Sequence, residues 1–308
     1  SSAAMSAVAF FFGREIQQSQ GIPVGLINCS YGGTVTETWC SPEVLAGGYP
    51  VWEKFEAEML KNPKWARRNT ASRLYNRMLK TVMPFPVKGF IWYQGEGNAG
   101  RAAEQQQLFP AMVKDWRQSW GDPALPFYIV QLARYEAATW HAFRCAQLEV
   151  WKNTPDSFMA VTIDLSKDWK KDNHPIHPST KAPIGHRLAL AARARVYGET
   201  KLVYSGPVIR GMRVEENRAV LSFDHLGSGL AALDGKPLRG FAVSADGVVF
   251  VPAGGKIVGQ TVVVAAAQVR NPVAVRYGAE MDMGKATLDI NLGNREMLPA
   301  SPFTLVAR

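Results

Sequence analysis

Three polar loops hold the side chains of this sequence that could do chemistry. Residues 30–34, 94–98 and 172–178 each follow an apolar run that predicts a buried strand. If those strands are parallel, their carboxyl ends lie along one sheet edge, where open α/β proteins bind ligands. The loops supply a His/Asp pair and two sets of hydrogen-bond donors. Apart from a nucleophile, these are the groups that an acyl-transfer site needs.

His177 is the predicted base, because an imidazole can take a hydroxyl proton and return it to a leaving alcohol near neutral pH. Asp172 could orient it through the other ring nitrogen; Asp164, at the end of a predicted strand, is the other nearby acid. An alternative is that His174 and His177 are ordinary turn residues. A metal site is disfavoured, because no Cys or further His lies nearby at ligand spacing, and no cofactor is expected.

The elements that position these loops alternate between strand and helix, which is typical of a parallel sheet. Strands are predicted at 24–29, 87–93, 127–132 and 158–164, and helices within 1–20, 41–83, 102–120, 139–153 and 179–196. From residue 206 short β-prone runs alternate with glycine and asparagine turns, at 219–223, 247–251, 260–265 and 272–277. The sequence therefore predicts an α/β domain over 1–203 and an all-β, sandwich-like module over 204–308.

Composition narrows the class of protein. The chain has 308 residues, 47% hydrophobic and 20% charged, which is typical of a globular protein. No apolar run approaches the ~20 residues that a membrane-spanning helix needs. The net charge is +9, but the basic residues are scattered, which disfavours nucleic-acid binding and suits acidic glycans or solubility. Three cysteines do not make a disulfide framework, so free thiols are favoured over a Cys29–Cys40 bridge.

Several motifs resemble those of the sialate O-acetylesterase family, which belongs to the SGNH-type hydrolases. Residues 91–99 read Ile-Trp-Tyr-Gln-Gly-Glu-Gly-Asn-Ala, similar to that family's signature block. Residues 30–39 fit its pattern Ser-x-Gly-Gly-Thr-x-x-Glu-x-Trp, and residues 177–181 fit the block that carries its catalytic histidine. Pro175 stands where the family often has its aspartate, and Asp172 is the preferred acid by reach. The resemblance implies an SGNH-like three-layer αβα sandwich.

The resemblance also implies roles for the loop residues. Gly32 or Gly33 would lend a backbone N–H to an oxyanion hole, and Gln94 or Asn98 would add a side-chain N–H. The candidates for binding the sugar are four further residues: Trp39, Tyr93, Glu96 and Trp140. The aromatic ones are equally plausible as core packing.

The family's nucleophile lies in a Gly-Gln-Ser-Asn block that this sequence does not contain. We therefore expect the serine to come from a second polypeptide or from an N-terminal segment outside this sequence. Ser30, which precedes two glycines, is the rival nucleophile. The predicted function is removal of acetyl groups from sialic acid or another acetylated sugar or polysaccharide. The alternative is a catalytically inactive carbohydrate-binding or accessory chain. A secreted or periplasmic location is implied only by what relatives act on.

Overall fold

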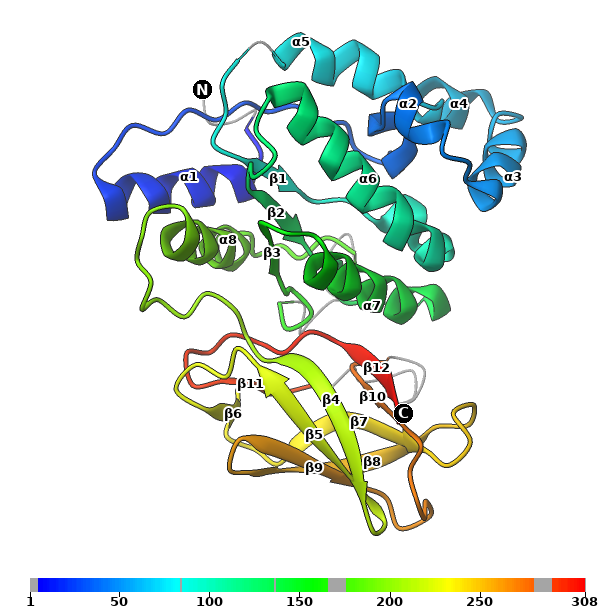
Figure 1. Cartoon of the computed structure of the whole chain (residues 1–308), viewed down its shortest axis with the longest axis vertical. Helices are drawn as coiled ribbons and strands as arrows, with labels where there is room; N and C mark the ends of the chain where they lie inside the picture. The colour runs from blue at the N-terminus through cyan, green and yellow to red at the C-terminus, as the bar shows by residue number, and fades with distance from the viewer. Residues whose placement is uncertain (1–4, 84, 136, 166–175, 280–289, 308) are drawn as a thin grey trace.

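The computed structural model describes residues 5–83, 85–135, 137–165, 176–279 and 290–307. Asp172 and His174 lie outside the described residues. The chain forms a helix-covered parallel sheet followed by a module of antiparallel strands (Figure 1). The predicted division after residue 203 falls between the last helix, which ends at Arg195, and the first strand of the module, which begins at Val208. No helix in the described ranges is long and apolar enough to cross a bilayer.

The parallel sheet has the strand order β1-β2-β3. These are β1 (Phe90–Trp92), β2 (Phe127–Val130) and β3 (Ser157–Ala160). Each strand is shorter than predicted, but each overlaps the β-branched and aromatic run that predicts it. Every residue of β2 and β3 is buried, because helices cover both faces of the sheet.

Two pairs of helices cover the sheet, one pair on each face (Figure 1). The first pair is α1 (Ala7–Gln20) and α8 (Ala182–Arg195), and the second is α6 (Ala102–Trp120) and α7 (Ala138–Asn153). Tyr128 and Val130 belong to the apolar cluster of the first pair, whereas Phe127 and Ile129 belong to the main core with α6 and α7. This alternation is the period of two expected along a strand.

The predicted helical region at 41–83 consists of several short helices. These are α2 (Pro42–Leu45), α3 (Pro50–Met59), α4 (Pro63–Asn69), a π-helical turn (Tyr75–Leu79) and α5 (Lys80–Val82). A proline opens each of the first three, where its missing N–H costs nothing. The region packs beside α6 and reaches back to the loop that follows residue 30.

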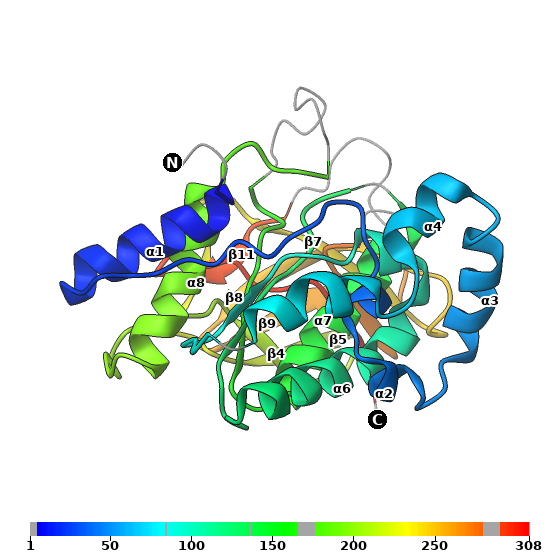
Figure 2. The same cartoon turned by 90° about the horizontal axis from the view of Figure 1, so that it is seen from above.

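The strand predicted at 24–29 does not form. Residues 21–30 run back along α1, with Leu26 packed on Gly13, and pair with no strand among those described (Figure 2). Ile27 is 51% exposed there. Apolar sequence favours an extended chain, but a strand also needs a neighbour for its N–H and C=O groups. Among the described residues, β1 pairs with a strand along one edge only, that of β2.

The C-terminal module contains a seven-stranded antiparallel sheet of order β12-β10-β7-β8-β9-β5-β4. Its strands are β4 (Val208–Glu215), β5 (Arg218–Asp224), β7 (Leu238–Ser244), β8 (Val251–Val258), β9 (Thr261–Ala265), β10 (Ala274–Tyr277) and β12 (Phe303–Val306). A separate pair joins β6 (Leu230–Ala232) to β11 (Leu292–Asn294). The strand predicted at 247–251 begins later than expected, at Val251 of β8, because 247–249 form a bend in which the Asp246 carboxylate accepts from the N–H groups of Val248 and Val249.

The module is joined to the α/β part by buried polar contacts. The Gln131 amide donates to Ser301 Oγ (2.8 Å), and the Arg144 guanidinium donates to the carbonyl oxygen of Gly278 (3.3 Å). Gln131 directly follows β2, so the module is fixed to the carboxyl end of the central strand. Cys29, Cys40 and Cys145 are free thiols, as predicted.

Candidate active site

The loop after β1 brings polar side chains out of the sheet edge. Gly95 lies against Phe143, where an added Cβ would come within 2.4 Å of the ring, so only glycine fits. The chain then turns into a short 3-10 helix, η4 (Glu96–Arg101). This tight turn places Gln94 before η4 and Asn98 within its first turn.

Gln94 and Asn98 join this loop to the one that follows residue 30. The Gln94 amide donates to the carbonyl oxygen of Thr34 (2.9 Å) and to Asn98 Oδ1 (2.8 Å). Asn98 Oδ1 also accepts from the Thr36 backbone N–H (2.9 Å), and the Thr36 hydroxyl donates to Gln94 Oε1 (2.9 Å). The structure therefore brings two of the three predicted loops together through a closed hydrogen-bond network.

The amide nitrogen of Asn98 donates to both carboxylate oxygens of Glu37 (3.2 and 3.1 Å). The two hydrogens of each amide, Gln94 and Asn98, are thus donated within the protein. In this arrangement both side chains hold the loops, and a role for either in an oxyanion hole stays a prediction.

Gly32 and Gly33 lie on the exposed part of the same network. Their carbonyl oxygens accept from Arg68 (3.4 Å) and from the Asn69 amide (3.4 Å). Asn69 also accepts from the Val35 N–H (3.0 Å), so one buried asparagine at the end of α4 holds both sides of the turn. Because the carbonyl oxygens are engaged, this glycine turn has a defined conformation, as an oxyanion-hole loop would require.

His177, from the loop at 172–178, lies close to the loop at 94–98. Its Nε2 lies 3.9 Å from Glu96 Oε1, and its side chain is 54% exposed. The alternative orienting acid, Asp164, is engaged elsewhere: its two oxygens accept from Arg187 at 2.7 and 2.6 Å. Both Asp164 oxygens are thus paired with Arg187, and the identity of the acid that orients His177 stays a prediction.

Comparison of this chain with known proteins identifies the family to which it belongs. Residues 3–194 match the family of carbohydrate esterases described as sialic acid-specific acetylesterases. This chain belongs to that family. The sialate O-acetylesterases of Homo sapiens and Mus musculus are 30% and 29% identical to it over 240 and 262 residues. A crystal structure of a novel carbohydrate acetylesterase from Xanthomonas citri shares 38% identity with a TM-score of 0.82.

Each alignment covers a larger share of this chain than of the relative. The human and mouse alignments include 72% of this chain but 45% and 48% of those proteins. The Xanthomonas structure covers 97% of this chain, which matches 65% of that one. The chain therefore spans about half the length of the curated relatives it matches. All the candidate site residues fall within the segment that matches the acetylesterase family.

Two of the predicted sugar-binding aromatics lie in the packed interior of this acetylesterase-family chain. Trp39 is 4% exposed and its indole N–H donates to Thr34 Oγ1 (3.0 Å). Trp140 is 6% exposed and donates to the carbonyl oxygen of Ala133 (2.9 Å). Both indoles stabilise loops at the sheet edge, and sugar contact by either stays a prediction. Tyr93 is partly buried, and the Lys181 ammonium lies 5.6 Å from the centre of its ring.

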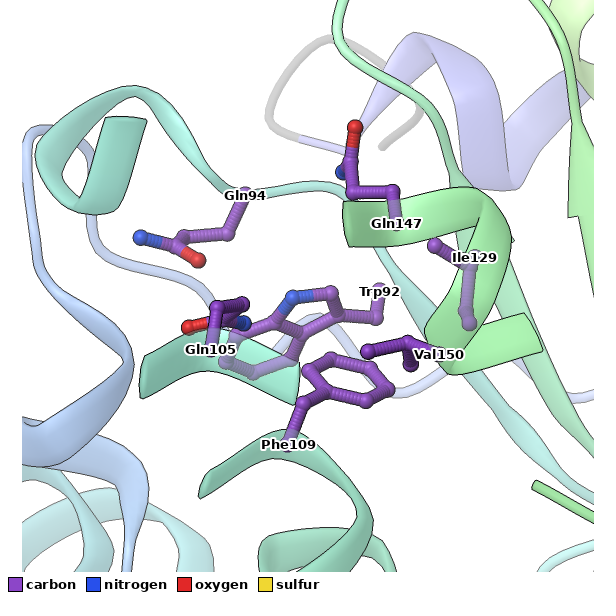
Figure 3. Close-up of a pocket in the computed structure, with 7 residues that line it drawn as sticks. All are labelled: Trp92, Gln94, Gln105, Phe109, Ile129, Gln147 and Val150. Atoms are coloured by element: carbon purple, nitrogen blue, oxygen red, sulfur yellow. The ribbon is translucent and has the colours of Figure 1, made fainter. Parts of the chain in front are cut away.

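A cavity of about 10 Å³ lies behind Gln94 and is lined by Trp92, Gln105, Phe109, Ile129, Gln147 and Val150 (Figure 3). This is close to the smallest volume that holds one water molecule, so it does not accommodate a sugar. The Gln105 and Gln147 side chains accept from Thr36 Oγ1 (3.3 Å) and the Leu132 N–H (2.9 Å). The cavity is part of the polar support beneath the loops.

Sequence reasoning missed the buried ion pairs behind these loops. Glu37 is fully buried against the Arg101 guanidinium, which also contacts Glu104 (3.2 Å). Glu104 in turn accepts from the first backbone N–H groups of α3, those of Val51 and Trp52. The only sequence feature that pointed to these pairs was Glu37 within its motif; nothing in the sequence indicated which arginine would contact it.

The rival nucleophile Ser30 is exposed and its hydroxyl donates to Asn28 (2.8 Å).

Proposed function

We propose that this chain forms the acid–base and oxyanion part of a carbohydrate O-acetylesterase that acts on sialic acid or another acetylated sugar. The observation that supports this most is the meeting of three separate loops. Gln94 and Asn98 bind the loop at 34–36, and His177 approaches Glu96 from the third loop. Membership of the acetylesterase family gives this constellation its chemistry.

In the proposed mechanism a serine hydroxyl attacks the acetyl carbonyl while His177 takes its proton. The tetrahedral oxyanion is stabilised by N–H donors, with Gly32 or Gly33 and Gln94 or Asn98 as candidates. The intermediate collapses to an acetyl-serine, and His177 returns the proton to the departing sugar oxygen. Water then enters, loses a proton to His177 and releases acetate. Asp172 is proposed to orient His177, and no cofactor is required.

We propose that the nucleophilic serine comes from a polypeptide segment outside this sequence, carried by the same chain or by a second one. Two features favour such a segment. β1 has one edge without a strand partner in the described part of the chain, and residues 24–29 belong to no strand among the described residues. A strand added at that edge would supply hydrogen-bond partners. The fold proposed for the assembly is the SGNH-like three-layer sandwich over 1–203, with 204–308 as a β-sandwich module, in a secreted or periplasmic protein.

Hydrolysis of p-nitrophenyl acetate and of an O-acetylated sialic acid tests this function. The chain is assayed alone and together with any segment or second chain found to carry the family's Gly-Gln-Ser-Asn block. We expect His177→Ala to reduce kcat by about 10³-fold or more, because the serine then lacks its base. Activity of the lone chain that vanishes in Ser30→Ala would move the nucleophile to Ser30.

Activity that survives His177→Ala in the assembly would overturn the mechanism. An assembly that binds the sugar but hydrolyses neither ester would support the alternative of an inactive accessory chain.

A further inference from the structure

The conformation of Glu96 is fixed by its loop. Glycines flank it, and a Cβ added at Gly97 would lie 3.0 Å from the Val35 side chain. Glu96 is the first residue of η4, and its side chain is 27% exposed. The close packing at Gly95 and Gly97 fixes the backbone that carries this carboxylate.

Two cationic or titratable side chains act on this carboxylate: His177 from the third loop and Lys181, the residue that precedes α8. His177 Nε2 lies 3.9 Å from Oε1, which is too far for a direct hydrogen bond but close enough for the two charges to interact. Lys181, near the Tyr93 ring, also acts on Glu96. The Tyr93 hydroxyl is buried and has no hydrogen-bond partner among the described residues. Glu96 thus lies among His177, Lys181 and Tyr93.

Burial raises the pKa of Glu96, and the backbone N–H groups and Lys181 oppose that rise. A carboxylate that is costly to ionise alone gains most when a cation forms beside it. Protonation of His177 creates such a cation. The interaction is reciprocal, so ionised Glu96 favours the imidazolium form of His177.

We propose that Glu96 is a positioning residue of the esterase reaction: its carboxylate stabilises the imidazolium that forms when His177 takes the proton of the nucleophile. The inference rests on the proposed function of His177 as base. It differs from a sugar-binding role for Glu96, because the carboxylate would act through the imidazole. The contact at Nε2 places the negative charge beside the nitrogen that exchanges the proton in a serine triad.

Titration of His177 by NMR tests the pair in the full chain without requiring turnover. Glu96→Gln keeps the shape of the side chain but removes its charge. We expect the pKa of His177 to fall by about one unit, because the imidazolium loses a nearby anion.

Glu15→Gln is the matched control, since Glu15 pairs with His186 at the surface (2.7 Å). This variant removes a surface carboxylate that contacts another histidine, so it should leave the pKa of His177 unchanged. A pKa of His177 that is the same in the wild type and in Glu96→Gln would overturn the inference.

The pH profile of kcat/KM in the active assembly separates positioning from sugar contact. Removing the anion lowers the pKa of His177, so the neutral base persists to lower pH and the acidic limb moves down by the same amount. We expect kcat to fall about tenfold with little change in KM, and Glu96→Asp to restore part of it. A raised KM with an unmoved acidic limb would show that Glu96 contacts the substrate instead.

An inactive wild-type assembly would overturn the proposed function. An active assembly in which the pKa of His177 does not change in Glu96→Gln would overturn this inference alone.

Discussion

At the scale of single residues, the conformation of the candidate active-site loops depends on buried charged side chains. Glu37 is fully buried, and it accepts from both Asn98 and Arg101. Asn98 in turn orients Gln94. A buried carboxylate needs such partners, because each unmade hydrogen bond to a charge costs free energy in the interior. The geometry of the candidate oxyanion loops is therefore set by an ion pair one layer beneath them.

Arg101→Met should show how much stability this pair supports. The substitution keeps volume but leaves Glu37 buried without its counter-charge, and it removes the packing of the guanidinium on Trp52 and Phe55. We expect the free energy of unfolding, measured with urea, to fall by about 3–5 kcal/mol. Lys61→Met is the control, since the Lys61–Glu58 pair is 70% and 75% exposed, and a change below about 0.5 kcal/mol is expected there. Equal losses in both variants would contradict the role given to Arg101.

At the scale of elements, the sequence predicted most helices and strands because their signals are local. The four-residue apolar spacing of 102–120 and the apolar runs at 127–132 and 158–164 each gave the correct element. The run at 24–29 failed because a strand also requires a partner, which sequence pattern does not report. For the same reason the sequence placed Gln94 and Asn98 in a turn but not their partners. Contacts such as Glu37–Arg101 depend on how distant elements pack.

The packing of α1 on α8 depends on Gly185. A Cβ at this position would lie 2.6 Å from the Phe11 Cβ and 2.7 Å from the Phe12 backbone nitrogen. Alanine favours a helix over glycine by up to ~1 kcal/mol, but backbone atoms of a packed helix cannot move aside cheaply. We expect Gly185→Ala to destabilise the protein by about 1–3 kcal/mol, measured as a lower urea midpoint. Gly25→Ala, which meets nothing within 4 Å, should leave the midpoint nearly unchanged; a stabilised Gly185→Ala variant would show that α1 can shift.

At the scale of the whole molecule, the β-module is attached next to the candidate active site. Gln131 and Arg144 contact Ser301 and Gly278 across the junction, and the His141 ring contacts Thr304 (2.9 Å). Burial, with the charge of Arg144 as a second cause, lowers the pKa of His141 to about 3. This imidazole therefore stays neutral at physiological pH, and the junction keeps its hydrogen bonds across that range. The two parts should consequently unfold as one unit.

Arg144→Met tests this coupling, because the guanidinium is fully buried between the carbonyl oxygens of Ala133 and Gly278. All nine tryptophans precede residue 204, so tryptophan fluorescence reports the α/β part, while far-UV circular dichroism also reports the module. In the wild type we expect the two signals to change together in urea, as in one cooperative transition. In Arg144→Met the fluorescence and circular-dichroism transitions should separate, with the fluorescence transition at lower urea, because two carbonyl oxygens lose their donor.

Arg193→Met is the control. It removes a guanidinium that pairs with Glu15 and Glu199 inside the α/β part, so it should lower both midpoints together. Coincident transitions in Arg144→Met would show that the apolar contacts of the junction alone keep the module and the active-site edge in one unit.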